Sequence, residues 1–422
     1  MAEDLTPPER SWLRRHLIDI EPLRRSRDFR FLYAGMAVSD LGNEITFVTI
    51  PFQVYDLTGS TLALGLLGVC DLVPLLVTPV IGGMIADTFE RRRMVLVING
   101  ILTVLAGVLI VNALRPEPSL WVLYVIATLN SALWGLYSPS VRAWPARLVD
   151  TELLPSAFAL EGAYYTVDAM AGPAVAGVLI QWIDPAGAYA VDLATFFVAL
   201  VLLGRVRPSP PGQDNPRAGW AAIKDGLRFL KGKRVLQSTY TIDLNAMIFG
   251  MPDALFPAVA AQRLGIGPAG LGLLYAAPAF GSLAASVFSG SLKHVRRQGR
   301  AILLAVAVWG VAIVAFGLST TLWLSVGFLA IAGAGDMVSG VFRTTISQTV
   351  VSDEMRGRLE GMGLTVWATG PSLGNVEAGV VASVFGVPFS IVSGGIACLV
   401  GVIAHAVFVP RFRDYDAADP HA

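Results

Sequence analysis

Charged residues are scarce in this chain of 422 residues: Asp, Glu, Lys and Arg make up 15% of it, against about 25% in ordinary soluble domains. Apolar residues make up 54%, and the mean hydropathy is +0.62. A soluble protein of this composition would have too little polar surface to cover itself. The composition therefore excludes an ordinary cytosolic enzyme, a disordered protein and a nucleic-acid-binding protein.

Cysteine and histidine are also scarce, with two and four residues. Cys70 and Cys398 lie in apolar runs, where a thiol behaves as a small hydrophobic group, so no disulfide is predicted. No zinc-site spacing or nucleophile elbow occurs, and the stretch 226–234 lacks the spacing of a phosphate-binding loop. We therefore predict no enzymatic activity, no metal site, no cofactor and no ATP hydrolysis. The energy source is expected to be an ion gradient.

Long apolar runs dominate the sequence instead. A helix needs about 20 mostly apolar residues to cross about 30 Å of hydrocarbon, and backbone polar groups in lipid must pair within the chain. The runs therefore predict twelve membrane-spanning helices. Their ranges are 31–55, 61–86, 94–114, 119–141, 157–182, 187–204, 237–261, 268–292, 300–318, 321–343, 360–384 and 387–409.

The basic residues predict the orientation of these helices. With a cytoplasmic N-terminus, 29 of the 31 Lys and Arg lie on the cytoplasmic side, and only Arg115 and Arg263 lie outside. Cytoplasmic loops retain Lys and Arg, so both termini are expected in the cytoplasm. Residues 1–30 carry seven Arg and no apolar core of a signal peptide, so no cleavage is expected. We predict a multi-pass protein of a bacterial cytoplasmic membrane.

The two halves of the chain repeat short motifs. The sequence LGLL at 64–67 recurs at 271–274, and Gly172-Pro173 recurs as Gly370-Pro371. Two six-helix repeats of the same orientation are known in secondary transporters, where a substrate cavity lies between halves that rock against each other. The predicted segments are a cytoplasmic interfacial segment (1–30), a six-helix bundle (31–204), a cytoplasmic linker (205–236), a second six-helix bundle (237–409) and a cytoplasmic tail (410–422).

Two cytoplasmic stretches carry apolar residues at helical spacing among basic ones. They are residues 12–23 and residues 218–231. Each is predicted to form an amphipathic helix on the inner leaflet, with a solvated linker as the alternative.

The segment 82–93, GGMIADTFERRR, resembles a signature of the major facilitator superfamily. Glu90 departs from the general signature and is similar to the enterobactin-type siderophore-exporter branch, as are the stretches 112–120, 272–292 and 353–361. Macrolide and multidrug exporters resemble neighbours of that branch. The resemblance implies an all-α membrane protein of twelve transmembrane helices in two six-helix pseudo-repeats. It also implies an exporter of a small-molecule substrate, and we expect this exporter to be a monomer.

In this signature the carboxylate of Asp87, at the cytoplasmic end of its helix, can face the positive N-terminus of another helix. The resemblance places that N-terminus near Glu360, and Arg91 and Arg92 can pair with a carboxylate such as Asp150 or Glu360. These contacts would close the cytoplasmic side and favour the outward-facing state, whereas an ordinary basic loop is the alternative. The predicted gate residues are Gly83, Asp87, Arg91, Arg92 and Arg93.

Residues 172–177 resemble the antiporter motif of exporters, with Ala176 where that motif has a glycine. A Gly-Pro step bends a helix and small residues allow close packing, although a generic kink is the alternative. The motif residues are Gly172, Pro173 and Gly177.

Ionisable groups at membrane depth are costly unless they are paired or protonated, so each is a functional candidate. Asp40 and Glu44 lie four residues apart and share one helix face. Two close carboxylates cannot both stay ionised cheaply, so one is expected to take up protons, as a proton-coupling site requires. Arg343 can neutralise an acid or hold an anionic substrate. The candidates for proton coupling or the substrate cavity are Asp40, Glu44, Asp71, Asp168, Asp243, Asp253, Asp336 and Arg343.

The alternative for each acid is a helix–helix contact without a transport role, and this alternative is favoured for Asp192 and Glu377. His405 is expected to serve in packing rather than in proton transfer. Six aromatic residues can stack on a flat substrate or anchor the membrane interface. They are Trp134, Tyr137, Tyr164, Tyr165, Tyr240 and Trp367.

Together these features predict a proton-driven secondary exporter of small amphipathic molecules that works by alternating access. A siderophore cargo is implied by the resemblance alone. The acidic cavity candidates suit cationic or neutral drugs better, so a multidrug or macrolide efflux antiporter is an alternative. A non-transporting membrane sensor or scaffold and an uptake permease are further alternatives, and the partial exporter motif disfavours the permease.

Asp87→Asn is expected to slow export while leaving folding intact, because the neutral amide weakens the charge–dipole contact of the gate. The measurement is the export rate of reconstituted protein. Unchanged turnover would contradict the assignment of Asp87 to a gate.

Overall fold

The computed structural model describes residues 19–142, 144–208, 224, 228–351 and 353–417, and the side chains of 86–88, 353–362 and 364–365 lie outside that description. The described residues form α-helices joined by short turns, with no strand among them. Nine helices in this part are long and apolar enough to cross a membrane. The protein is therefore a multi-pass membrane protein.

The described first half of the chain contains a short α-helix, five long ones and the short 3-10 turns η1 (Pro145–Arg147) and η2 (Thr151–Leu153). Ser26 and Ser60 cap two of them by accepting hydrogen bonds from the backbone N–H groups of Phe29 and Ala63. The fifth is interrupted, because Ile183 and Asp184 have non-helical backbone before Pro185. The helices are α2 (Glu21–Arg25), α3 (Arg27–Thr58), α4 (Thr61–Thr88), α5 (Arg91–Ala113), α6 (Leu120–Arg142) and α7 (Leu154–Gly204).

The second half begins with α9 (Arg234–Gly250), which continues into the turns η3 (Asp253–Leu255), α10 (Phe256–Ala258) and η4 (Val259–Leu264). The long helices that follow are α11 (Pro268–Val287), α12 (Gln298–Leu318), α13 (Leu322–Val350), α14 (Asp353–Phe385) and α15 (Val387–Phe408). The short η5 (Ser289–His294) follows α11, and α16 (Pro410–Arg413) follows α15.

One predicted helix differs from the structure. The stretch Arg234–Leu264, which contains the span predicted over 237–261, is long and apolar enough to cross a membrane. Its helix is not continuous, however, because α9 ends at Gly250 and the chain resumes as the 3-10 turn η3. Pro252 lacks a backbone N–H and disfavours helical backbone in the residue before it, which explains the break. Asp253 therefore lies on a turn and not on a helix.

The predicted amphipathic helices fall mostly outside the described residues. Of 12–23, only 19–23 are described, and α2 begins at Glu21 within them. Of 218–231, only 224 and 228–231 are described. Both remain predictions.

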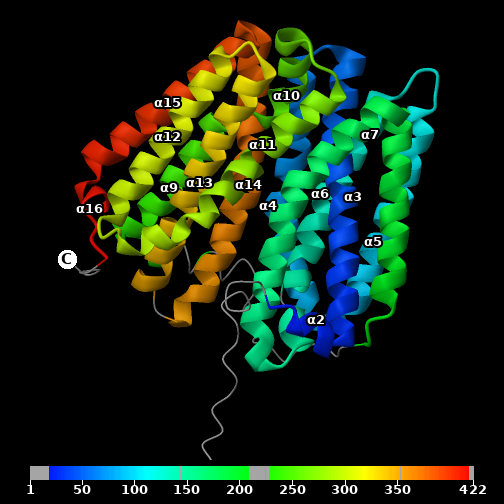
Figure 1. Cartoon of the computed structure of the whole chain (residues 1–422), viewed down its shortest axis with the longest axis horizontal. Helices are drawn as coiled ribbons and strands as arrows, with labels where there is room; N and C mark the ends of the chain where they lie inside the picture. Colours follow the sequence, from blue (N-terminus) through cyan, green and yellow to red (C-terminus); the bar gives the residue numbers. More distant parts are fainter. Residues whose placement is uncertain (1–18, 143, 209–223, 225–227, 352, 418–422) are drawn as a thin grey trace, which may run out of the picture.

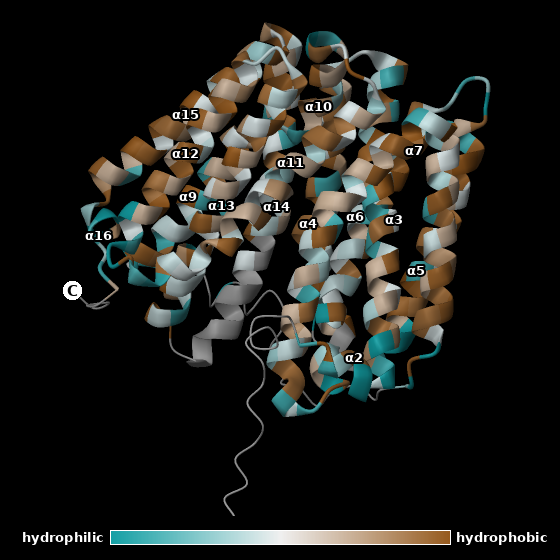
Figure 2. Ribbon diagram, viewed as in Figure 1, coloured by the Kyte–Doolittle hydropathy of each residue, from teal (hydrophilic) through white to brown (hydrophobic). Residues whose placement is uncertain are grey.

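The outer helices present apolar side chains on their exposed faces. On α5 these residues are spaced three or four apart, as Val97, Ile101, Val104, Val108 and Val111. Figure 2 shows hydrophobic residues along α5, α12 and α15, and hydrophilic ones near α2 and α16. Exposed apolar stripes of this length are expected where a helix faces lipid rather than water.

Two sets of helices lie side by side in the molecule (Figure 1). Helices α3 to α7 pack mainly against one another, and α9, α11 to α13 and α15 do the same, while α14 packs against α9 and α15 and at least as extensively against α4. We call α3 to α7 the N half and α9 to α15 the C half. The most extensive contacts between the halves are made by α4 with α14 and by α7 with α11.

Pairs of glycines form these contacts between the halves. A Cβ atom added to Gly65 would lie 3.0 Å from the Cα of Gly379, and one added to Gly272 would lie 3.1 Å from the Cα of Gly177. Gly65 and Gly272 are the glycines of the repeated LGLL motif. The repeat therefore packs twice, each time against the opposite half, and the absence of side chains lets the backbones approach closely.

These contacts lie at one end of the bundle. Gln262 of η4 donates a hydrogen bond of 2.5 Å to the hydroxyl of Tyr55 on α3. Gln181 of α7 accepts one of 3.2 Å from the backbone N–H of Ala269 on α11. Tyr55 and Ala269 lie near the ends of α3 and α11 that hold the α3–α4 and η4–α11 connections, and Gln181 lies just before the break of α7 at Ile183 and Asp184. We call this end the closed end.

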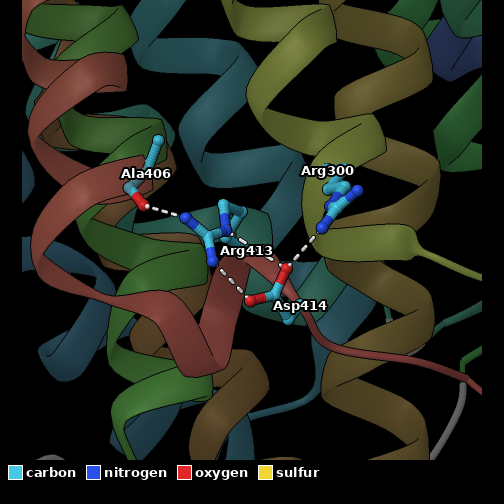
Figure 3. A network of polar contacts seen from close by, with 4 residues as sticks. All are labelled: Arg300, Ala406, Arg413 and Asp414. Carbon is cyan, nitrogen blue, oxygen red and sulfur yellow. Dashed lines mark hydrogen bonds and ion pairs between the residues drawn. The ribbon is translucent and has the colours of Figure 1, made fainter.

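At the opposite end, the C-terminal segment 409–417 docks on the C half. Asp414 accepts hydrogen bonds from Arg413, at 2.6 and 3.1 Å, and from Arg300 of α12, at 2.7 Å (Figure 3). Phe412 is fully buried, and the Tyr415 hydroxyl lies 3.3 Å from that of Thr349 on α13. The segment 409–417 thus contacts the ends of α12 and α13 and follows directly on α15.

Gly272→Val is expected to separate α7 from α11, because the new side chain would meet backbone atoms of Pro173 and Gly177 that cannot rotate away. The measurement is thiol cross-linking of Gln181→Cys with Ala269→Cys in a protein without Cys70 and Cys398. The cross-linked fraction should fall severalfold. Gly327→Val is the matched control, because nothing lies within 4 Å of a Cβ there; an equal loss in both variants would refute the packing role.

Asp414→Asn is expected to lower the melting temperature at pH 7 by on the order of 1 °C, as for other exposed ion pairs. Hydrogen bonds from Arg413 and Arg300 hold the pKa of the Asp414 carboxyl well below its ordinary value. A carboxyl whose pKa is lower in the folded than in the unfolded protein stabilises the fold when it is ionised. This stabilisation is complete above the ordinary Asp pKa of about 3.9 and is lost as the pH falls. The difference between wild type and variant should therefore shrink below about pH 4. The exposed Asp56→Asn serves as control, and a difference independent of pH would contradict the network.

Candidate functional site

Three carboxylates meet inside the N half, between α3 and α7. The hydroxyl of Tyr164 donates a hydrogen bond of 3.0 Å to Asp40. Asp168, one helical turn beyond Tyr164, interacts electrostatically with both Asp40 and Glu44. We call Asp40, Glu44 and Asp168 the acid cluster. The sequence predicted that Asp40 and Glu44 share a face, and the structure adds Asp168 and the phenol of Tyr164.

Gly172 lies against Glu44 of the acid cluster and leaves space for its side chain. A Cβ atom at this position would lie 2.5 Å from the Cβ of Glu44, so a side chain here would displace Glu44. The following residues serve the contact between the halves, because Pro173 and Gly177 meet Gly272. The motif at 172–177 therefore links the surroundings of Glu44 to the closed end. Nothing in the spacing of the motif indicated this double contact.

Two other acids of the N half make contacts between neighbouring helices. Asp71 on α4 accepts a hydrogen bond from Ser131 on α6. Asp192 on α7 is buried and accepts one of 2.5 Å from Thr46 on α3. These hydrogen bonds join helices of the same half and do not involve the acid cluster.

The C half holds the second charged group. Arg343 on α13 forms an ion pair with Asp243 on α9, and its other terminal nitrogen lies 3.4 Å from Asp336, two turns away on α13. We call these three residues the Arg343 cluster. It lies beside a cavity of about 220 Å³ between α9, α13 and α14. The structure thus brings together three of the residues predicted from sequence.

Asp253 is separate from this cluster. It begins the turn η3, and its backbone carbonyl accepts a hydrogen bond of 3.1 Å from Tyr275. The next residue, Ala254, donates its backbone N–H to Asn375 of α14 at 3.0 Å. These bonds stabilise the broken segment after α9.

The predicted gate residues are described in part. Arg92 donates a hydrogen bond of 2.6 Å to the carbonyl of Gly204 at the end of α7, and Arg93 pairs with Glu90 at 2.9 Å. Arg92 thus bonds a backbone carbonyl at the end of α7, and the pairing of Arg91 and Arg92 with a carboxylate such as Asp150 or Glu360 stays a prediction. Terminal carbonyls of a helix lack donors and attract cations, which explains the bond to Gly204. The Asp87 and Glu360 side chains lie outside the described residues.

Aromatic side chains reach across the halves. Trp134 of α6 and Trp367 of α14 have ring centroids 6.2 Å apart, and the guanidinium of Arg142 lies 6.0 Å from the ring of Trp367. Tyr164 stacks on Tyr165 at 4.3 Å, beside the acid cluster.

His405 of α15 has two polar neighbours. One ring nitrogen lies 2.9 Å from the hydroxyl of Thr241 on α9, and the other lies 2.8 Å from the carbonyl of Gly401. It therefore joins two helices of the C half.

Comparisons with known proteins place the chain in a family. The model of a family described as "Transmembrane secretion effector" matches residues 19–422. The enterobactin exporter EntS of Shigella flexneri is 27% identical over 408 residues, which cover 96% of this chain and 97% of that protein. EntS of Escherichia coli O157:H7 matches with the same identity and coverage.

Solved structures share the fold. A mutant form of the nucleoside transporter NupG superposes with a TM-score of 0.74 at 10% identity, covering 91% of this chain and all of that one. A bacterial homologue of the human lysosomal transporter Spinster, in an inward-facing and occupied conformation, gives 0.73 at 16% identity, covering 92% and 98%. At these identities the likeness concerns the fold alone. With the family match, it confirms the superfamily expected from residues 82–93. The chain belongs to the transmembrane secretion effector family of major facilitator exporters, and it is a membrane transporter rather than an enzyme.

Proposed function

We propose that this protein is a proton-coupled secondary exporter of a small amphipathic siderophore, of the enterobactin type, in a bacterial cytoplasmic membrane. The likeness to enterobactin exporters over 96% of the chain supports the cargo. The acid cluster carries the proposal of proton coupling, because three carboxylates from two helices of one half cannot all stay ionised cheaply in the membrane.

In the proposed topology twelve helices cross the membrane and both termini are cytoplasmic. The distribution of Lys and Arg supports this orientation, since 29 of 31 then lie inside. Long helices overlie the predicted ranges, and the break at Ile183 and Asp184 supports two spans within α7. The transporter acts as a monomer in this proposal, and each half carries six spans.

The proposed cycle is alternating access. With this topology, the closed end faces outward, and the described conformation corresponds to a transporter open toward the cytoplasm. Protons loaded from outside neutralise the acid cluster, and their release inside accompanies cargo binding. The glycine contacts at Gly65 and Gly272 would separate in the outward-open state, and the gate at Asp87 and Arg91 to Arg93 would then close the cytoplasmic side.

A multidrug efflux antiporter is the second candidate. The observation that favours it is the excess of carboxylates: the acid cluster holds three, and the Arg343 cluster holds two for one guanidinium. An anionic environment favours cationic or neutral amphipathic cargo.

A deletion strain grown in low iron distinguishes the two candidates. Loss of a secreted iron chelator from the medium supports the siderophore exporter. Sensitivity to antibiotics with normal chelator secretion supports drug efflux. A strain with normal chelator secretion and normal antibiotic sensitivity would contradict both proposals.

Asp40→Asn and Glu44→Gln are each expected to reduce proton-driven export by at least about tenfold, because the neutral amides cannot exchange the coupled proton. The measurement is export of enterobactin from proteoliposomes under an imposed pH gradient. Asp192→Asn is the matched control, since this buried carboxylate bonds Thr46 away from the cluster. If both neutral variants still pump under the gradient, the coupling carboxylate lies elsewhere.

A further inference from the structure

Phe31, near the start of α3, holds two arginines at the end of the N half opposite the closed end. The Cζ atoms of Arg27 and Arg205 lie 5.4 and 5.7 Å from the centre of its ring. These distances are typical of cation–π contacts. Phe31 itself packs against the core of the N half, which includes Leu203 and Val206. The ring therefore positions both arginines at the point where α3 begins and α7 ends.

Both arginines are exposed, and neither forms an ion pair with a described residue. The carboxylate of Asp28, next to Arg27 in the chain, is already occupied, because Arg207 donates to it from its side chain at 2.7 Å and from its backbone N–H at 3.2 Å. The adjoining undescribed segments hold equal numbers of acids and arginines, three of each in 1–18 and one of each in 209–223. The described part of this site thus carries two positive charges whose N–H donors are not used within it.

An apolar stripe leads along α7 to Arg205. Phe197, Val198 and Val201 are exposed, and Arg205 follows Val201 by about one helical turn. At 1.5 Å per residue the stripe is about 12 Å long, close to the roughly 15 Å of hydrocarbon in one leaflet. Exposed apolar residues on a membrane-spanning helix face lipid. The two arginines therefore lie at the level of lipid head groups, directly beside a surface that suits an acyl chain.

We propose that Arg27, Phe31 and Arg205 form a binding site for an anionic phospholipid of the leaflet at this end of the bundle. The guanidiniums donate to the phosphate oxygens of the head group, and an acyl chain lies along Phe197 and Val201. A free phosphate would make only the first of these contacts, so the stripe selects the lipid. A zwitterionic lipid carries a cation that the arginines repel. The inference depends neither on the proposed orientation nor on the proposed cargo.

This lipid site adjoins a residue of the predicted gate. Arg92 donates its hydrogen bond to the carbonyl of Gly204, the residue directly before Arg205. A lipid bound to Arg205 therefore holds the same end of α7 that Arg92 contacts, and the linker between the two halves begins there. The bound lipid thus stabilises the N half at the point where the chain leaves it.

Helix α15 offers a matched surface without the paired arginines. Its exposed residues Val400 and Val407 belong to a similar apolar stripe, and Arg411 follows Val407 by four residues at the same end of the molecule. Arg411 is exposed and makes no ring contact or ion pair with a described residue, whereas the nearby Arg413 is paired with Asp414. If anionic lipid were drawn only by the general attraction of basic residues, it would occupy both stripes alike.

Phosphatidylglycerol with a photoreactive diazirine on its acyl chain tests the site in the full-length protein, reconstituted in phosphatidylcholine liposomes. Mass spectrometry measures the labelling of 197–201 and of 400–407. In the wild type the first stripe should be labelled severalfold more than the second, and a phosphatidylcholine probe should label both alike. Arg27→Gln and Arg205→Gln should each lower the labelling of 197–201 by up to about fivefold, the effect on Kd of losing one charge beside the head groups. Phe31→Leu, which keeps both charges, should lower it less.

Arg411→Gln is the matched control, because it removes one exposed cation at the same end and should leave the labelling of 197–201 unchanged. Equal losses in Arg205→Gln and Arg411→Gln would overturn the site, as would equal labelling of 197–201 by the two probes. An excess of glycerol phosphate that displaces the phosphatidylglycerol probe would indicate a site for soluble anions and would overturn the lipid. Since Arg27 and Arg205 are exposed, their variants should keep the wild-type melting temperature in phosphatidylcholine, which separates lost binding from misfolding.

Discussion

Every charged group inside the membrane must be paired, protonated or hydrogen-bonded, and this constraint organises the protein. Arg343 lies between the carboxylates of Asp243 and Asp336. Ser131 and Thr46 donate hydrogen bonds to Asp71 and Asp192. The hydroxyl of Tyr164 donates one to Asp40. Glu44 and Asp168 have no such partner among the described residues. A carboxylate that lacks a partner in the membrane can take up a proton at low cost, because no ion pair is lost. The incomplete pairing of the acid cluster therefore suits the proton coupling that we propose.

Glycines let the backbones of the two halves approach closely. The glycines at 65, 177, 272 and 379 place helices of opposite halves in direct contact. Aromatic and polar side chains also meet across the halves, such as Trp134 with Trp367 and Tyr55 with Gln262. The interiors of the halves are filled by large buried side chains such as Trp144 and Phe316. The alternating access that we propose would separate the contacts between the halves and leave those interiors packed.

The two halves differ in the charges that they carry. The N half has carboxylates with a phenol between α3 and α7, which suits proton exchange. The C half has the ion pair of Arg343 and Asp243 beside a small cavity. The charged groups of the two halves thus lie on different pairs of helices, α3 with α7 and α9 with α13.

The sequence by itself determined the class of protein, because apolar runs of membrane length depend only on local composition. It also placed Asp40 and Glu44 on one face, since their spacing follows from helix geometry. The break after Gly250, the approach of Asp168 to Asp40, the bond of Arg92 to Gly204 and the pairing of Arg343 with Asp243 were decided by the tertiary structure. The physical reason is that these contacts join helices distant in the chain, whose relative rotation and depth are set by packing, and periodicity within one helix carries no information about its neighbour.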